Sequence, residues 1–288
     1  MKALVIAEKP SVARDIARVL KCGKKINGAI EGERYIVTWG LGHLVTLADP
    51  EDYDKKYKEW KMDVLPMKPV PFKLEVIKQT GKQFAAVKTQ IHRKDVNEII
   101  IATDAGREGE LVARLILEKA GSKKPIKRLW ISSVTDKAIR EGFAKLKNGH
   151  EYDSLYDAAM CRAEADWLVG INATRALTCK YNAQLSCGRV QTPTLTMIAK
   201  REEKIRSFVP EGYYGMIAKG QNIMLTWQDQ KSKSYRSFDK EKMTGLMKKL
   251  DGQKAVVEEI KKTPKKTYAP PLYDLTELQR EANQRTIR

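Results

Sequence analysis

Acidic side chains gather directly behind an apolar run in the stretch IIATDAGREGE, Ile100 to Glu110. The isoleucines at 99–101 predict a buried strand, and Asp104, Glu108 and Glu110 follow it closely. Acids at the end of a buried strand cost free energy unless a metal or a basic side chain neutralises them. The plainer interpretation is a helix start, because acids in a first turn suit the positive end of the helix dipole. The stretch therefore predicts either a metal site or an acid-rich helix N-terminus.

A second pair of charged residues, Glu8 and Lys9, follows the first apolar run, Lys2 to Ala7. In an open α/β sheet, ligands collect beyond the carboxyl ends of the strands. If the two strands are neighbours, Glu8, Asp104 and Glu108 converge on one crevice beside Lys9. Carboxylates of this kind suit Mg²⁺, and a lysine supplies a point charge for a phosphate. The two stretches together indicate a magnesium and phosphate site.

The elements that would position these residues alternate along the first half of the chain. Apolar runs predict strands at 2–7, 35–39, 97–103 and 127–131. Helical spacing predicts a helix capped by Ser11, a helix over 107–120 ending at Gly121, and a helix over 136–146. Such alternation is typical of an α/β fold with a largely parallel sheet.

The second half of the chain has a different pattern. A long helix is predicted over 152–180, and Thr192-Pro193 predicts the start of another that runs to about 208. Strand-like segments follow at 213–218, 223–228 and 255–260, then a basic linker over 261–266. Leu275 begins the final predicted helix.

The composition favours a nucleic-acid partner and excludes several classes of protein. Lys and Arg total 54 against 36 acids, a net charge of +18 with a pI near 9.6, which suits a polyanion. The four cysteines form no C-x-x-C pair, so neither a zinc site nor a disulfide framework is expected. No stretch approaches the roughly 20 apolar residues of a membrane span, and Glu8 interrupts the first apolar run too early for a signal peptide. We therefore expect a cytoplasmic protein that is not membrane-bound.

The segment Ser186 to Pro193 (SCGRVQTP) has the features of an anion site. A short loop that enters a helix presents backbone N–H groups, and Gly188 allows a phosphate to approach closely. Arg189 can pair with that phosphate, and Gln191 can hydrogen-bond to backbone or base. On the preceding helix, Arg162 and Asp166 are spaced to pair with each other.

Two tryptophans are candidate stacking residues, because an indole face stacks on any base. Trp167 lies on the predicted long helix, where it is either a base-stacking residue or a core residue. Trp60, in YKEWKMD, either stacks on a base or packs on the surface. The sequence alone leaves both alternatives open.

Four segments together carry a family resemblance: VIAEKPSVARDIA, TDAGREGELVAR, RAEADWLVGINATRA and LSCGRVQTPTL. In this order they resemble the type IA DNA topoisomerases, and within them the bacterial topoisomerase III group. The resemblance implies a Toprim (Rossmann-like) domain over 1–150, a helical single-strand DNA-binding domain over 151–212, and part of a β-rich arch domain over 213–288. It also implies Mg²⁺-dependent cleavage of one DNA strand, passage of another, and religation, which relaxes negatively supercoiled DNA.

The resemblance assigns roles residue by residue. It implies that Glu8 and Asp104 bind Mg²⁺, that Glu108 is the third acid, and that Lys9 lies near the scissile phosphate. Gly106 departs from the family pattern, in which many relatives have a second Asp, and this predicts a site with less negative charge. The residues implied to contact single-stranded DNA are Trp167, Arg175, Ser186, Cys187, Gly188, Arg189, Val190 and Gln191, to which the stacking candidate Trp60 is added.

The family's nucleophile is missing from these 288 residues. A type IA enzyme attacks the DNA backbone with a tyrosine, in a segment resembling YPRTDS, and holds a phosphotyrosine ester. The match extends through LYDLTELQREANQR, and no such tyrosine segment occurs. We therefore expect an N-terminal part of a topoisomerase that cannot cleave DNA alone; the alternative is an inactive remnant that binds Mg²⁺ and single-stranded DNA. A Toprim nuclease or primase is disfavoured by SCGRVQTP and RAEADWLVG.

Overall fold

The computed structural model describes residues 1–220, 223–254, 256–257 and 259–286. It divides into two compact units, Met1–Arg206 and Ser207–Arg288. Each unit is described separately below. None of the helices in the described part of the chain is long and apolar enough to cross a membrane.

A seven-stranded mixed sheet forms the centre of the first unit, in the order β2-β3-β4-β1-β7-β8-β9. Strands β4, β1, β7 and β8 are mutually parallel, whereas the strands at both ends pair antiparallel. The α/β fold is thus confirmed, but the sheet is mixed, with parallel pairing in its four central strands and antiparallel pairing at both edges. The bounds are β1 Lys2–Ala7, β2 Lys24–Ile26, β3 Ala29–Glu31, β4 Tyr35–Trp39, β7 Val96–Ala102, β8 Ile126–Arg128 and β9 Lys147–Asn148.

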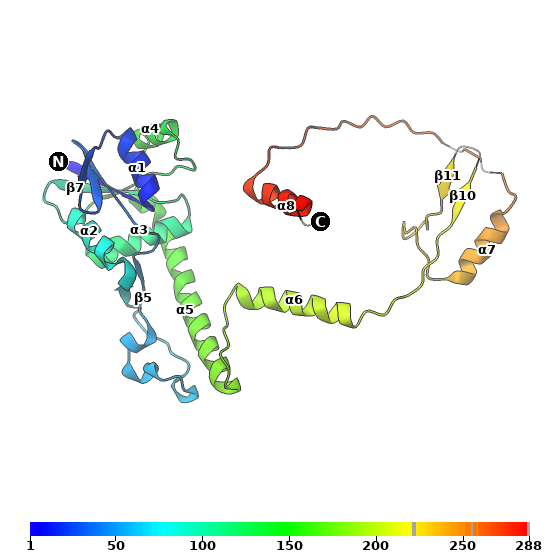
Figure 1. Cartoon of the computed structure of the whole chain (residues 1–288), viewed down its shortest axis with the longest axis horizontal. Coiled ribbons are helices and arrows are strands. Elements are labelled where there is room, and N and C mark those ends of the chain that lie inside the picture. The colour runs from blue at the N-terminus through cyan, green and yellow to red at the C-terminus, as the bar shows by residue number, and fades with distance from the viewer. Residues whose placement is uncertain (221–222, 255, 258, 287–288) are drawn as a thin grey trace. The chain divides into compact units, whose positions relative to one another are not determined.

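Helices cover both faces of this sheet (Figure 1). Helices α1 (Pro10–Val19) and α4 (Asp136–Ala144) pack on one face, where Ile16 and Ile139 are fully buried. Helices α2 (Gly81–Ile91) and α3 (Arg107–Ala120) pack on the other face. Both faces of the central strands are therefore buried, which explains their nearly continuous apolar sequences.

The predicted helix boundaries are partly right. Gly121 ends α3 in the left-handed conformation, with φ of 71°, as expected for a C-cap. The predicted cap at Ser11 is wrong: α1 begins at Pro10, and its N-cap Lys9 makes no side-chain capping bond. Proline at the first helical position supplies the fixed φ that starts the helix. Helix α2 was not predicted at all.

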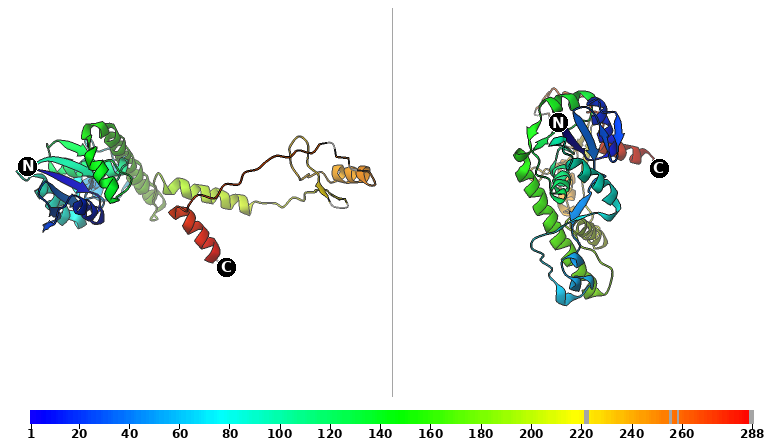
Figure 2. Two further views of the ribbon diagram at one scale, coloured as in Figure 1. Left: turned by 90° about the horizontal axis from the view of Figure 1, so that it is seen from above. Right: turned by 90° about the vertical axis from the view of Figure 1, so that its left-hand side faces the viewer.

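The long helix α5 (Asp153–Tyr181) leaves the sheet and runs beside residues 45–76 (Figures 1 and 2). These residues include the antiparallel pair β5 (Val45–Leu47) and β6 (Leu74–Val76). After a loop, α6 (Gln191–Arg206) completes the first unit. The long helix predicted over 152–180 is confirmed.

The described part of the second unit contains two short strands and two helices. Strands β10 (Ile217–Lys219) and β11 (Met224–Thr226) pair antiparallel, so the first two predicted strands are present but shorter. The third predicted strand, 255–260, is not formed at 256–257 or 259–260, while 255 and 258 lie outside the described residues. Helices α7 (Lys240–Leu250), which was not predicted, and α8 (Leu275–Thr286) complete the unit.

Glu31 makes the stability of the first unit depend on pH. Its carboxylate accepts hydrogen bonds from Lys2 Nζ at 2.7 Å and Arg93 Nη2 at 2.6 Å, and these bonds lower the pKa of Glu31 to about 2. A lowered folded-state pKa adds stability above the ordinary pKa of about 4.3, and this stability is lost as the pH falls towards 2. We predict that Glu31→Gln lowers the melting temperature at pH 6 and that this difference shrinks by pH 2.5. A difference independent of pH would contradict the assignment.

Candidate metal and DNA-binding site

Glu8 and Asp104 come together at the carboxyl edge of the sheet. Strands β1 and β7 are neighbours, with Ala7 opposite Ala102, as the proposed crevice required. The backbone N–H of Asp104 donates to Glu8 Oε2 at 3.1 Å. Glu8 is partly buried, whereas Asp104 and Lys9 are exposed. Lys9 forms no ion pair with any residue that the structure describes, so its charge is available to a ligand.

Glu108 is directed to a different partner. His43 Nε2 lies 2.7 Å from Glu108 Oε1. The loop that carries His43 is fixed beside Glu8, because Gly40 N donates to Ala7 O at 2.8 Å and Gly42 N donates to Glu8 O at 3.3 Å. His43 was not among the predicted site residues. Its Gly-rich turn follows β4 at the same edge of the sheet, and this position could have identified it as a neighbour of the site.

The carboxylate oxygens of Glu8 and Asp104 are ligands of the kind that Mg²⁺ prefers, but three protein ligands do not come together here. Within the residues that the structure describes, no three histidine, cysteine or carboxylate side chains converge closely enough to hold a metal ion. Mg²⁺ keeps several waters and needs only one or two protein carboxylates plus a phosphate. Glu8 and Asp104 supply that minimum, whereas Glu108 contacts His43 through Oε1 and has one further carboxylate oxygen for a metal.

Glu110 is neutralised by arginines. Its carboxylate is fully buried and contacts Arg128 Nε at 2.9 Å and Arg114 Nε at 2.9 Å. Of the acids in TDAGREGE, this one therefore has a structural explanation that needs no metal. Burial lowers the pKa of Arg128, and the Glu110 carboxylate opposes that effect.

Arg128 also fixes the backbone that carries Asp104. Its guanidinium is fully buried and donates to the carbonyl oxygens of Thr103 at 2.8 Å and Asp104 at 2.6 Å. From the other side, Thr103 Oγ1 donates to Gly109 O at 2.7 Å. The turn between β7 and α3 is thus held by side-chain hydrogen bonds at both of its ends.

A side chain at position 106 would have open space around it. The φ of Gly106 is 179°, an extended conformation open to any residue, and a Cβ there would meet nothing within 4 Å. We predict that Gly106→Asp folds normally and tightens Mg²⁺ binding by roughly three- to tenfold, because it adds a negative charge beside Asp104. Titration calorimetry measures the affinity, with Gly106→Asn as the uncharged control. Equal affinities in the two variants would show that position 106 does not face the metal.

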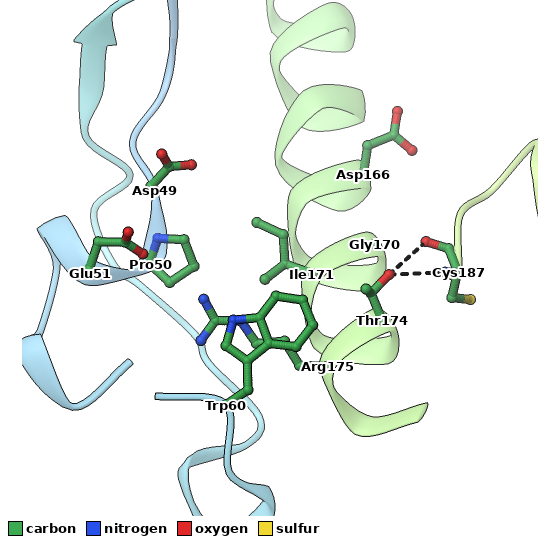
Figure 3. Close-up of a pocket in the computed structure, with 10 residues that line it drawn as sticks. All are labelled: Asp49, Pro50, Glu51, Trp60, Asp166, Gly170, Ile171, Thr174, Arg175 and Cys187. Carbon is green, nitrogen blue, oxygen red and sulfur yellow. Dashed lines mark hydrogen bonds between the residues drawn. The ribbon is translucent and has the colours of Figure 1, made fainter. Parts of the chain in front are cut away.

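The surface predicted to bind DNA contains a cavity of about 470 Å³ between α5 and residues 49–60 (Figure 3). Trp60 is 49% exposed, and its ring lies 5.1 Å from the Arg175 guanidinium carbon. Arg175 itself is only 4% exposed, and it donates through Nη1 to Tyr57 O. Its Nε is buried and has no hydrogen-bond partner among the described residues.

Trp167 lies in the core. Its ring is 9% exposed and forms edge-to-face contacts with Tyr53 and Phe72, at centroid distances of 5.8 and 5.5 Å. Its indole N–H donates to Ala48 O at 2.9 Å. A base-stacking residue needs an open ring face, so the packing favours the core alternative for Trp167, whereas Trp60 has the required exposure.

Two backbone N–H groups of the loop before α6 donate hydrogen bonds to threonine side chains of this chain. Cys187 N donates to Thr174 Oγ1 at 2.9 Å, and Gly188 N donates to Thr192 Oγ1 at 3.0 Å. These two donors were expected to face an anion, and a phosphate would have to displace the threonine hydroxyls. The neighbouring Ser186, Val190 and Gln191 are exposed.

Arg189 forms an ion pair with Asp166. Its Nη2 lies 3.0 Å from Asp166 Oδ2, and the hydrogen bonds from Arg189 lower the pKa of Asp166. Arg162 Nε is 3.8 Å from the same carboxylate, which confirms the predicted pairing along the helix. Asp166 therefore occupies the position that a phosphate would take beside Arg189.

Two sequence families match consecutive parts of the chain. The Toprim domain matches residues 3–134, and the DNA topoisomerase domain matches residues 150–286. DNA topoisomerase 3 of Bacillus subtilis (strain 168) is 67% identical over 284 residues, which are 99% of this chain and 39% of that protein. DNA topoisomerase 3 of Bacillus cereus (strain ATCC 14579) is 66% identical over 285 residues, with the same coverage.

A solved structure has the same fold. Full-length topoisomerase I from Thermotoga maritima superposes with a TM-score of 0.57 at 24% identity, covering 85% of this chain and 37% of that one. The chain therefore belongs to the type IA DNA topoisomerase family, with a Toprim domain followed by topoisomerase-domain sequence. Within that family it is similar to the DNA topoisomerase 3 proteins and spans about 39% of the length of the relatives it matches.

Proposed function

We propose that this chain supplies the magnesium- and single-strand-binding part of a type IA topoisomerase reaction, in which one DNA strand is cut, another is passed, and the cut is resealed. The observation that carries the proposal is the contact between Glu8 and the Asp104 amide beside the unpaired Lys9. Magnesium bound there would neutralise the negative charge of a DNA phosphate. Because the proposed substrate is DNA, we propose a cytoplasmic location.

The residues of the chain have separate tasks in this proposal. Glu8 and Asp104 hold the cation, with the second carboxylate oxygen of Glu108 as a third ligand. Lys9 pairs with the scissile phosphate. The three proposed domains, 1–150, 151–212 and 213–288, divide the work between metal binding, strand binding and the arch.

Strand binding centres on the cavity between α5 and residues 49–60. We propose that Trp60 stacks on a base, which contributes roughly 1–3 kcal/mol without reading sequence. Arg175 supports the Trp60 ring, and Arg189 exchanges Asp166 for a phosphate. The remaining loop residues, Ser186 to Gln191, lie beside the strand, whereas Trp167 supports α5 from the core and does not contact the strand.

Cleavage requires a nucleophile that these 288 residues do not contain in recognisable form. We propose that the chain assayed alone binds single-stranded DNA and leaves a negatively supercoiled plasmid unrelaxed in the presence of Mg²⁺. Relaxation by this chain would contradict the missing-nucleophile part of the proposal while leaving the binding part intact.

Strand binding is tested by fluorescence anisotropy with a labelled single strand of fifteen thymidines. Arg189→Glu should weaken binding by about tenfold, because it removes a phosphate partner and adds repulsion. Arg201→Glu is the matched control, since Arg201 is exposed on α6 and makes the same charge change; it should weaken binding less than about twofold. Equal losses in the two variants would mean that the loop is not the binding surface.

A further inference from the structure

A basic cavity lies away from the carboxylate crevice, at the opposite end of α1. It has a volume of about 520 Å³ and is formed by the last turns of α1, the following turn, and the β2–β3 hairpin. Lys25 and Ile30 are opposite each other in the register of the hairpin, so both face this cavity. Lys9 lies at the start of α1, about 15 Å away along a helix of ten residues. The cavity is therefore distinct from the proposed metal site.

The floor of this cavity is apolar. Ala17 and Cys22 are 2% and 8% exposed, and Ile30 is partly buried beside them. Burial raises the pKa of the Cys22 thiol, which therefore stays neutral. An apolar side chain of moderate size could be buried on this surface.

The rim is cationic and largely uncompensated. Arg14, Lys21 and Lys25 are exposed, and none of their side chains has an ion-pair partner among the described residues. Arg18, also on the rim, is held by Asp136 at 2.8 Å and Asp15 at 3.4 Å. No carboxylate lines the cavity.

The usual explanation for lysines on an edge strand is protection against pairing with another strand. That explanation applies to Lys24 and Lys25, because β2 is an edge strand of the sheet. It does not apply to Arg14 and Lys21, which lie on α1 and in the turn after it. Cationic side chains without an ion-pair partner among the described residues come from three separate elements and surround one apolar floor. This arrangement suits a docking site.

We propose that this cavity docks an acidic peptide segment of a protein partner that carries one apolar side chain. The apolar side chain packs on Ala17, Cys22 and Ile30, and the flanking carboxylates pair with the cationic rim. The complementary charge and the apolar floor favour this occupant over DNA, because a phosphodiester backbone would use the cations and leave the floor unfilled. The proposal is independent of the function proposed for the carboxylate crevice.

The test uses fluorescence anisotropy with a labelled peptide of six aspartates followed by one leucine. This peptide should bind at least about tenfold more tightly than a control peptide in which serines replace the aspartates. It should bind about threefold more tightly than a second control peptide in which serine replaces the leucine. Lys21→Glu/Lys25→Glu should remove most of this binding. Lys82→Glu/Lys88→Glu is the matched control, because both lysines are exposed on α2, across the sheet, and the net charge change is identical.

Two outcomes would overturn the proposal. Equal losses in the two double variants would mean that only the overall positive charge attracts the peptide. The same measurement is made with a labelled 20-base-pair DNA duplex. If Lys21→Glu/Lys25→Glu weakens binding of the duplex more than binding of the peptide, the cavity is a nucleic-acid surface.

Discussion

Replacing Arg128 by methionine should destabilise the chain by about 3 kcal/mol, the lower end of the cost of breaking a buried ion pair, because Glu110 keeps Arg114 as a second partner. Both Arg128 and Glu110 are fully buried and 2.9 Å apart. The substitution also leaves the carbonyl oxygens of Thr103 and Asp104 without their buried donor. Urea-induced unfolding measures the loss.

The double variant Glu110→Leu/Arg128→Met is the control for this prediction. It removes both charges together, and replacing a buried pair with apolar side chains is often neutral. Arg114 keeps its contacts with Asp153 at 2.8 Å and Gly149 O at 2.7 Å in this variant. We expect the double variant to be more stable than Arg128→Met alone. A double variant that is less stable than the single one would mean that the unpaired charge of Glu110 does not cause the loss in Arg128→Met.

Gly109→Ala should distort the metal site, with an expected loss of about 2–3 kcal/mol in stability and at least about tenfold in Mg²⁺ affinity. A Cβ at position 109 would lie 2.1 Å from Asp104 O and 2.9 Å from Asp104 C and N. These are backbone atoms, which cannot rotate away as a flexible side chain could. The turn between β7 and α3 would therefore open and move the Asp104 carboxylate.

Gly106→Ala is the matched control for Gly109→Ala, since the same atom is added three residues earlier in open space. It should change the free energy of unfolding by less than about 1 kcal/mol and the Mg²⁺ affinity by less than about twofold. If Gly109→Ala behaves like Gly106→Ala, the close approach of α3 to Asp104 does not control the site.

The central sheet was predictable because its sequence signals are strong. Runs such as Ile99 to Ile101, buried on both faces, are long enough to identify strands without knowing their neighbours. Helix α2 was missed although Phe84, Val87 and Ile91 have helical spacing and Thr80 occupies its N-cap position, because the helix begins at Gly81, a poor helix former. The short strands at the sheet edges contain too few residues to give a periodic signal.

The candidate site was predictable in its residue types but not in their partners. Glu108 and Glu110 look equivalent in the sequence, yet Glu110 faces the buried Arg128 whereas Glu108 faces His43. Arg128 and His43 are 18 and 65 residues away along the chain, so local spacing could reveal only the pairing of Glu110 with Arg114, four residues further on. Trp167 is similar: its burial depends on Tyr53 and Phe72, which belong to a segment distant in sequence.

The most direct test of the proposed metal site is calorimetric titration of Mg²⁺ into the chain bound to the fifteen-thymidine strand. We predict that one Mg²⁺ binds per chain and that the double variant Glu8→Gln/Asp104→Asn loses this binding. The control Glu33→Gln/Asp63→Asn, which removes the same charge from two exposed positions, should retain it. Equal binding by the two double variants would contradict the assignment of Glu8 and Asp104 as the metal ligands.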